Sequence, residues 1–270
     1  MELMANGIRY HIEMTGDEDC PVLVLLHGFT GSTATWNPVI EHWPDFRVVT
    51  IDLIGHGKSD SPTDKNRYAM ERQLEDLESI FEKLDLNGFS LLGYSMGGRT
   101  ALAYACEYPD RINELILESA SPGLLLEAER LQRQETDARL AQEILKFGIK
   151  PFVAKWENIS LFDSQKSLPK SVQQQIRQER LAQSAQGLAN SLLGMGTGSQ
   201  RTYWNCLQDL NVPVLLLTGE LDSKFCAIAQ RMQQLLPNAE HRIISAGHAI
   251  HVEKPAEFAT MVMERLNQNY

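Results

Sequence analysis

Six short apolar runs constrain the fold of this chain most. Unlike the strands of a half-exposed sheet, they do not alternate apolar with polar residues along their length. The runs cover residues 22–26, 48–51, 90–93, 114–118, 212–218 and 242–245. Because this pattern is typical of strands that are buried on both faces, it predicts a mostly parallel sheet.

Helical patterns lie between several of these runs. In residues 70–84, the apolar side chains recur at steps of three and four residues, namely Leu74, Leu77, Phe81 and Leu84. This spacing places them on one face of an amphipathic helix. Alternating strands and helices predict an α/β fold, with a mostly parallel, twisted sheet flanked by helices.

Residues 121–204 interrupt this alternation. They contain no convincing strand, whereas residues 127–147 and 171–193 have helical patterns, with breaks at Pro151 and Pro169. We therefore expect a helical cap at 121–204, inserted into a core made of residues 1–120 and 205–270. The glycine-rich stretch 194–198 is expected to be a hinge that returns the chain to the sheet.

The charge of the chain is distributed unevenly. Its 35 acidic and 25 basic residues give a net charge of −10, which opposes binding to nucleic acid or to an anionic membrane. The expected cap is different, because it holds 11 basic and 8 acidic residues. This excess indicates either an anion-binding surface or ordinary solvated helix faces.

The cysteines and the N-terminal segment bear on the compartment. Cys20, Cys106, Cys206 and Cys226 lie far apart and form neither a CxxC pair nor a metal-binding pattern, so we expect free thiols, no metal and a reducing cytosol. Residues 1–16 lack the basic start and apolar run of a signal peptide. No apolar stretch approaches the roughly 20 residues that span a bilayer. The expectation is a soluble, cytoplasmic protein.

The strongest chemical signal is a G-x-S-x-G motif around Ser95. Residues 93–98 read Gly-Tyr-Ser-Met-Gly-Gly, directly after an expected strand and before a helical pattern. This is the strand-turn-helix setting of a nucleophile elbow, in which a strained turn lifts the serine hydroxyl above the sheet. Ser95 is therefore the candidate nucleophile.

A serine hydroxyl needs a histidine and an orienting carboxylate, which follow it in this chain order. Asp222 and His248 each lie just beyond an expected strand, where open α/β sheets place their sites. Glu220 is the alternative acid and His251 the alternative base. We expect His251 to pack or cap, and we assign Asp222 and His248 to the site.

The segment His27-Gly28-Phe29 follows the first apolar run and supplies an expected oxyanion hole. The backbone N–H groups of Phe29 and of Met96, the residue after the serine, are its expected donors. His27 itself is expected to be structural. No chemical role is assigned to the remaining histidines, which are His11, His42, His56 and His241.

These motifs together resemble the α/β-hydrolase family with a helical cap. They are HGF at 27–29, DLIGHGKS at 52–59, GYSMGG at 93–98, GELD at 219–222 and GH at 247–248. More narrowly, GYSMGGR at 93–99, ESASPGL at 118–124, Arg133 and Arg180 resemble the 2-succinyl-6-hydroxy-2,4-cyclohexadiene-1-carboxylate synthases of menaquinone biosynthesis.

The resemblance implies roles for particular residues. It implies a catalytic triad of Ser95, Asp222 and His248. It implies that a small tricarboxylate substrate contacts Arg99, Arg133, Arg180, Tyr94 and Trp156. Planar guanidinium groups suit such a substrate, because each can bind a carboxylate through two hydrogen bonds. No cofactor is implied, and a monomer or small homo-oligomer is expected.

The resemblance also implies a reaction, the elimination of pyruvate from a cyclohexene precursor, with Ser95 as the base that His248 activates. Two alternatives stay open, because fold and triad alone do not determine the reaction. One is a serine hydrolase of small esters or of carbon–carbon bonds. The other is a non-catalytic ligand-binding protein on a hydrolase scaffold.

Overall fold

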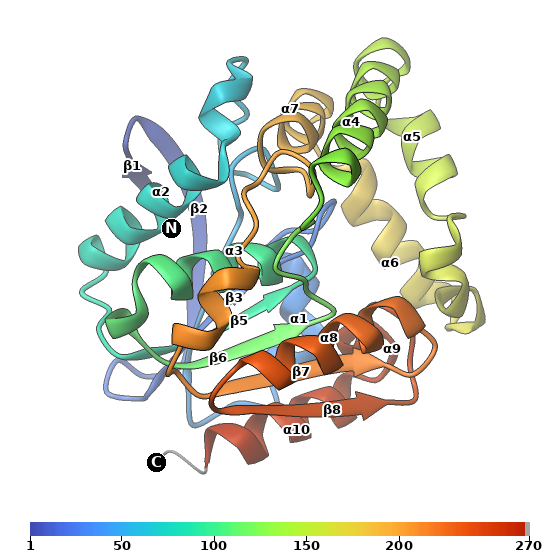
Figure 1. The fold of residues 1–270 in the computed structure, drawn as a ribbon. Coiled ribbons are helices and arrows are strands. Elements are labelled where there is room, and N and C mark those ends of the chain that lie inside the picture. Colours follow the sequence, from blue (N-terminus) through green and yellow to red (C-terminus); the bar gives the residue numbers. More distant parts are fainter. Residues whose placement is uncertain (268–270) are drawn as a thin grey trace.

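The computed structural model describes residues 1–267, which form one eight-stranded sheet with helices on both faces (Figure 1). The order across the sheet is β1-β2-β4-β3-β5-β6-β7-β8. Strand β2 pairs antiparallel with both β1 and β4, and all other pairs are parallel. The strands are β1 Glu2–Ala5, β2 Ile8–Thr15, β3 Val22–Leu26, β4 Arg47–Ile51, β5 Phe89–Tyr94, β6 Ile112–Glu118, β7 Val214–Gly219 and β8 Ala239–Ile244.

The predicted α/β fold and its six strands are confirmed, with shifts of up to three residues at their ends. The prediction that all six are buried is wrong for β8, which lies at the edge of the sheet and is mostly half-exposed, with Ile243 exposed. Strands β1 and β2 were not predicted. They lie at one edge of the sheet, and β2 alternates buried with exposed positions over part of its length. A search for unalternating apolar runs therefore misses them.

Helices cover the two faces of the sheet and create two separate apolar clusters. In β3, Val24 and Leu26 point to one cluster, whereas Leu23 and Leu25 point to the other. The helices of the core are α1 Asn37–Ile40, α2 Met70–Lys83, α3 Met96–Glu107, α8 Ser223–Leu235, α9 Ile250–Glu253 and α10 Pro255–Leu266. Short 3-10 segments complete it, namely η1 Thr33–Trp36, η2 Lys65–Tyr68, η3 Pro109–Arg111 and η5 Trp204–Asp209.

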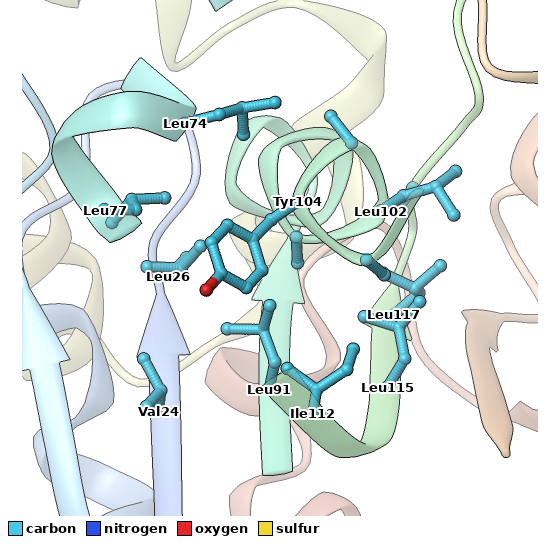
Figure 2. Packing of buried hydrophobic residues seen from close by; sticks show 14 of the residues in the cluster. Val24, Leu26, Leu74, Leu77, Leu91, Leu102, Tyr104, Ile112, Leu115 and Leu117 are labelled. Carbon is cyan, nitrogen blue, oxygen red and sulfur yellow. The ribbon is translucent and has the colours of Figure 1, made fainter. Parts of the chain in front are cut away.

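Helix α3, which follows the nucleophile turn, is anchored in the first of these clusters. Figure 2 shows Tyr104 of α3 packed above Leu91 of β5, with Leu77 of α2 at its side. All three side chains are completely buried. Since each buried side chain of this size contributes roughly 1.5–3 kcal/mol, this packing anchors α3 on the sheet.

A second group of helices lies between β6 and β7 and is gathered on one side of the sheet (Figure 1). It consists of α4 Glu127–Phe147, α5 Ile149–Trp156, η4 Ser160–Ser167, α6 Lys170–Leu181 and α7 Ala185–Met195. These helices bury an apolar cluster of their own, which includes Ile144, Val153 and Leu188. We call this group the cap, and its limits at 121–204 remain a prediction.

One predicted helix of the cap, at residues 171–193, is in fact two. Helix α6 ends at Leu181, and Ser184 begins α7 by accepting a hydrogen bond from the backbone N–H of Gly187 at 3.1 Å. A serine in this position favours a new helix start. Its capping role was not visible because the apolar spacing continues across the break. None of the helices within residues 1–267 is long and apolar enough to cross a membrane.

The expectation of four free thiols is wrong for two of the cysteines. Cys106 at the end of α3 and Cys206 in η5 form a disulfide, with Cα atoms 6.1 Å apart and a separation of 100 positions in the sequence. Cys20 and Cys226 are free. The pairing depends on how the segment after the cap returns across α3, which sequence spacing does not reveal.

This disulfide predicts a thiol count and a stability change. Denatured protein purified without reductant should show two reactive thiols, and four after reduction. Closing a loop of this length contributes about 4–5 kcal/mol, so Cys106→Ser should lower the melting temperature while Cys20→Ser should not. Four thiols before reduction would contradict the pairing.

Candidate active site

Ser95 lies in a sharp turn between β5 and α3. Its backbone φ of 51° is unusual for a residue other than glycine. Its backbone N–H donates a hydrogen bond to the carbonyl of Glu118 at 2.9 Å. Gly97 permits the turn, because a Cβ atom there would lie 2.0 Å from the carbonyl oxygen of Leu26. The turn therefore requires a glycine next to β3, as the motif predicted.

The structure brings His248 and Asp222 to this serine. Nε2 of His248 lies 3.0 Å from the Ser95 hydroxyl, and its Nδ1 lies 2.6 Å from a carboxylate oxygen of Asp222. Asp222 follows β7, where its other oxygen accepts a hydrogen bond from the N–H of Phe225 at the start of α8. Glu220, the alternative acid, is exposed and makes no such contact with the histidine.

The alternative base, His251, is occupied elsewhere. It is completely buried, and its Nδ1 lies 2.7 Å from the carboxylate of Glu118. The ring of Tyr94 lies between the two histidines, with its centroid 5.4 Å from that of His248 and 4.6 Å from that of His251. His251 thus packs against the back of the site, as expected.

His27 supports the loop that carries Phe29. Its Nε2 accepts a hydrogen bond from the N–H of Leu53 at 3.0 Å, so Nδ1 carries the proton and donates to the carbonyl of Gly28 at 2.8 Å. Burial lowers the pKa of His27 to about 4. Burial, together with repulsion from His27, lowers the pKa of the neighbouring His56 to about 3.

These two histidines predict acid sensitivity. Their ordinary pKa of 6.5 lies above the folded values, so the unfolded chain binds more protons in acid. Their contribution to stability is complete above pH 6.5 and is lost as the pH falls toward 4 for His27 and 3 for His56. Between pH 7.5 and 5, the free energy of unfolding in urea should fall by about 2 kcal/mol for each. A His56→Gln variant with an unchanged pH slope would contradict this.

A cavity of about 390 Å³ opens above Ser95 between core and cap. Ser95, His248, Phe29, Met96 and Tyr94 line it from the core, and Trp156 lines it from the cap. Met96 is the first residue of α3, where a backbone N–H has no partner within the helix. Both expected oxyanion donors therefore belong to residues of this cavity.

The cavity is rich in cations although the chain is acidic. Four basic residues and one acidic residue line it, namely Arg99, Arg133, Lys224, Arg231 and Glu129. Arg99 hydrogen bonds to neutral oxygens of Met195 and Gln200. No carboxylate within residues 1–267 forms a direct ion pair with it, although Asp137 attracts it from a longer distance. Burial and the nearby charge of Arg133 lower the pKa of Arg99 to about 10.

Arg133 and Arg180 differ in position. Arg133 lines the cavity and is held by the buried Asp137, whose carboxylate lies 2.8 Å from its Nε. Burial raises the pKa of Asp137. Arg180 is buried behind Phe162, with its guanidinium 4.6 Å from the ring centroid, and lines neighbouring cavities instead of the one above Ser95. Its contact with substrate remains a prediction.

The sequence analysis missed two basic residues at the cavity. Lys224 and Arg231 lie on α8 directly after Asp222, and the guanidinium of Arg231 lies 4.3 Å from the ring centroid of Trp204. They are seven residues apart, which places them on the same helix face. That spacing after the candidate acid is the signal that could have found them.

Comparison with known proteins agrees with this arrangement. Residues 21–255 match the family described as the alpha/beta hydrolase fold. A Bacillus subtilis protein, provisionally named 2-succinyl-6-hydroxy-2,4-cyclohexadiene-1-carboxylate synthase, is 46% identical over 97% of this chain and 96% of its own. A Salmonella arizonae protein with the same name, without that qualification, is 33% identical over 90% of this chain and 92% of its own.

A solved structure is also similar over nearly the full length. It is described as MenH from S. aureus, and it superimposes with a TM-score of 0.92 at 41% identity, covering 96% of this chain and 98% of that one. These matches exceed what a shared fold alone requires. The chain belongs to the α/β-hydrolase fold family and, within it, to the family of the 2-succinyl-6-hydroxy-2,4-cyclohexadiene-1-carboxylate synthases.

Proposed function

We propose that this protein is a carbon–oxygen lyase. It eliminates pyruvate from 2-succinyl-5-enolpyruvyl-6-hydroxy-3-cyclohexene-1-carboxylate and forms 2-succinyl-6-hydroxy-2,4-cyclohexadiene-1-carboxylate, a step of menaquinone biosynthesis. The observation that carries the proposal is the set of cations around Ser95. Within residues 1–267, Arg99 forms no direct ion pair with a carboxylate, and Arg133 lines the same cavity, so the two guanidinium groups share the single nearby carboxylate of Asp137.

The triad would remove a proton from a carbon atom of the substrate. His248, oriented by Asp222, takes the proton of the Ser95 hydroxyl, and the alkoxide then takes the proton from the ring carbon that bears the succinyl ketone. The ketone oxygen gains negative charge. The backbone N–H groups of Phe29 and Met96 are suited to stabilise this charge by donating hydrogen bonds to the oxygen.

The remaining bond changes balance the reaction. As the ring electrons rearrange to the conjugated diene, the bond between the ring and the enolpyruvyl oxygen breaks. Pyruvate leaves as its enolate and takes up a proton. No oxidant or reductant is required.

The substrate is proposed to bind as a polyanion. The guanidinium groups of Arg99 and Arg133 can each hold one carboxylate through two hydrogen bonds. The indole N–H of Trp156 is buried without a hydrogen-bond partner in residues 1–267, and it can donate to a further substrate oxygen. Tyr94 contributes the side wall of the cavity.

We also propose a cytoplasmic location and a monomer or small homo-oligomer. The location is supported by the biosynthetic role, whereas the disulfide opposes it, because disulfides seldom persist in a reducing cytosol. Fractionation and light scattering test the two statements directly.

The deciding experiment for the activity supplies purified protein with the cyclohexene tricarboxylate. Ultraviolet absorbance of the conjugated diene and an assay of free pyruvate should rise together, in equal amounts. Rapid cleavage of p-nitrophenyl acetate without any pyruvate would favour the second candidate, a serine hydrolase, which the same Ser95–His248 geometry supports. Tight binding without turnover of either compound would favour a binding protein.

A further inference from the structure

The loop that carries His248 is fastened by two carboxylates that the proposed mechanism does not use. On the side of the sheet, one oxygen of Glu118 accepts the N–H of Ile250 at 2.6 Å and the N–H of His251 at 3.1 Å. On the other side, Glu253 accepts the N–H of Gly247, the residue before the histidine, at 2.7 Å. Residues 247–251 are thus held at both ends.

Glu253 has a second contact, and it comes from the cap. Its other carboxylate oxygen accepts a hydrogen bond from the hydroxyl of Ser164 in η4 at 2.8 Å, across 89 residues of sequence. One carboxylate therefore joins the cap to the backbone beside His248.

The packing at this junction leaves no space. A Cβ atom on Gly247 would lie 2.0 Å from the Ser164 hydroxyl and 2.9 Å from a carboxylate oxygen of Glu253. Only a residue without a side chain allows η4 to approach the loop this closely. The close contact of η4 with the loop therefore depends on the glycine that precedes His248.

The same cap segment touches the imidazole directly. The ring of Phe162 in η4 lies edge-on to that of His248, with centroids 6.4 Å apart, and Phe162 also lines the cavity above Ser95. The backbone of η4 is kinked at Phe162, which has a φ of −112°. Movement of η4 would thus act on His248 in two ways. Phe162 would act on the imidazole ring, and Ser164 would act on the neighbouring backbone through Glu253.

We propose that Glu253 is a positioning residue that couples the seating of the cap to the orientation of His248. With η4 seated, the Ser164–Glu253–Gly247 connection holds Nε2 of His248 toward Ser95. Without it, residues 247–251 keep the contacts of Glu118 and the hydrogen bond from His248 to Asp222, but the N–H of Gly247 loses its acceptor. The inference rests on the catalytic roles proposed for Ser95 and His248.

The test compares Glu253→Ala, Glu253→Gln, Ser164→Ala and the double alanine variant. Ser167→Ala is the matched control, because this hydroxyl lies in the same cap segment and donates to the Ser164 carbonyl instead. For each protein, kcat and KM for pyruvate release, the melting temperature, and the rate at which an alkyl fluorophosphonate labels Ser95 are measured. Labelling reports the activated serine without requiring the lyase substrate.

Glu253→Ala should lower kcat and the labelling rate about 10- to 100-fold, because small misplacements of a catalytic group are costly. KM should remain close to that of the wild type, and the melting temperature should fall by only a few degrees because two hydrogen bonds are lost. Glu253→Gln should restore most of the rate, since its carbonyl can accept from Gly247 and its amide can donate to Ser164. Ser164→Ala should lower the rate less, and it should add nothing in the Glu253→Ala background.

Several results would overturn the coupling. They are wild-type labelling by a folded Glu253→Ala protein, a loss confined to KM or melting temperature, and independent, multiplying effects of the two alanine variants. If Glu253→Ala does not fold, equal labelling of Ser164→Ala and Ser167→Ala overturns it. A wild type that is labelled but releases no pyruvate refutes the lyase proposal alone, and the labelling rates still decide the coupling.

Discussion

Ser95→Ala is expected to reduce pyruvate release by roughly four to six orders of magnitude while the protein stays folded. Triad members act as a unit, so removal of the hydroxyl leaves only the contributions of binding and of the oxyanion donors. The substitution is also compatible with the fold, because α3 and β5 are anchored by buried side chains such as Tyr104 and Leu91.

The measurement needs a control for contaminating enzyme and one for folding. Circular dichroism should match the wild type, and His248→Ala, prepared in parallel, should show a loss of similar size. A folded Ser95→Ala protein with near wild-type turnover would remove the hydroxyl from the mechanism. A large loss with Ser95→Ala but not with His248→Ala would mean that another group activates the serine.

Substitution of the cavity arginines should separate anionic from neutral substrates. Arg133→Ala leaves a substrate carboxylate unpaired in a partly dry site, which costs roughly 2–5 kcal/mol and lowers kcat/KM by about 30- to several thousand-fold. Arg99→Lys should also lose activity, because an ammonium group cannot reproduce the planar pair of donors. Cleavage of an uncharged p-nitrophenyl ester, if present in the wild type, should change little.

Arg180→Ala provides the comparison within the cap. Arg180 lies behind Phe162 and outside the cavity, so its loss should affect the tricarboxylate less than the loss of Arg133 does. Equal losses for both variants would show that the cap rearranges around substrate. Equal losses on neutral and anionic substrates would indicate collapse of the cap. All rates should be measured at one ionic strength, because salt screens exposed charges more strongly than buried ones.

The sequence was most informative where local pattern and chemistry coincide. Ser95, Asp222 and His248 each follow a run that is recognisable as a buried strand, and parallel strands present their carboxyl ends at one edge. Placing them at that edge requires only the order of elements. The helix at 127–147 was predicted to the residue. Its end carries a clear stop signal in Gly148, and its first turn carries Glu127 and Glu129, although no side chain caps its start.

The features that the sequence did not reveal depend on contacts between distant segments. The Cys106–Cys206 pair, the burial of Arg180 and the connection of Ser164 to Glu253 each join parts of the chain that are 15 to 100 residues apart. Glu118 illustrates the difficulty. It ends a strand-like run and gives no sign that its carboxylate, completely buried, binds the loop after His248.

The position of the cap between β6 and β7 also determines when the site can exist during synthesis. Ser95 precedes His248 by 153 residues, so at about 5–20 residues per second the ribosome adds the histidine some 8–30 seconds after the serine. Until β7 is made, β6 is an unpaired edge that can join another chain. The edge of β6 is thus exposed during part of the interval in which the site is incomplete. Slower translation of the cap should therefore lower the yield of active protein.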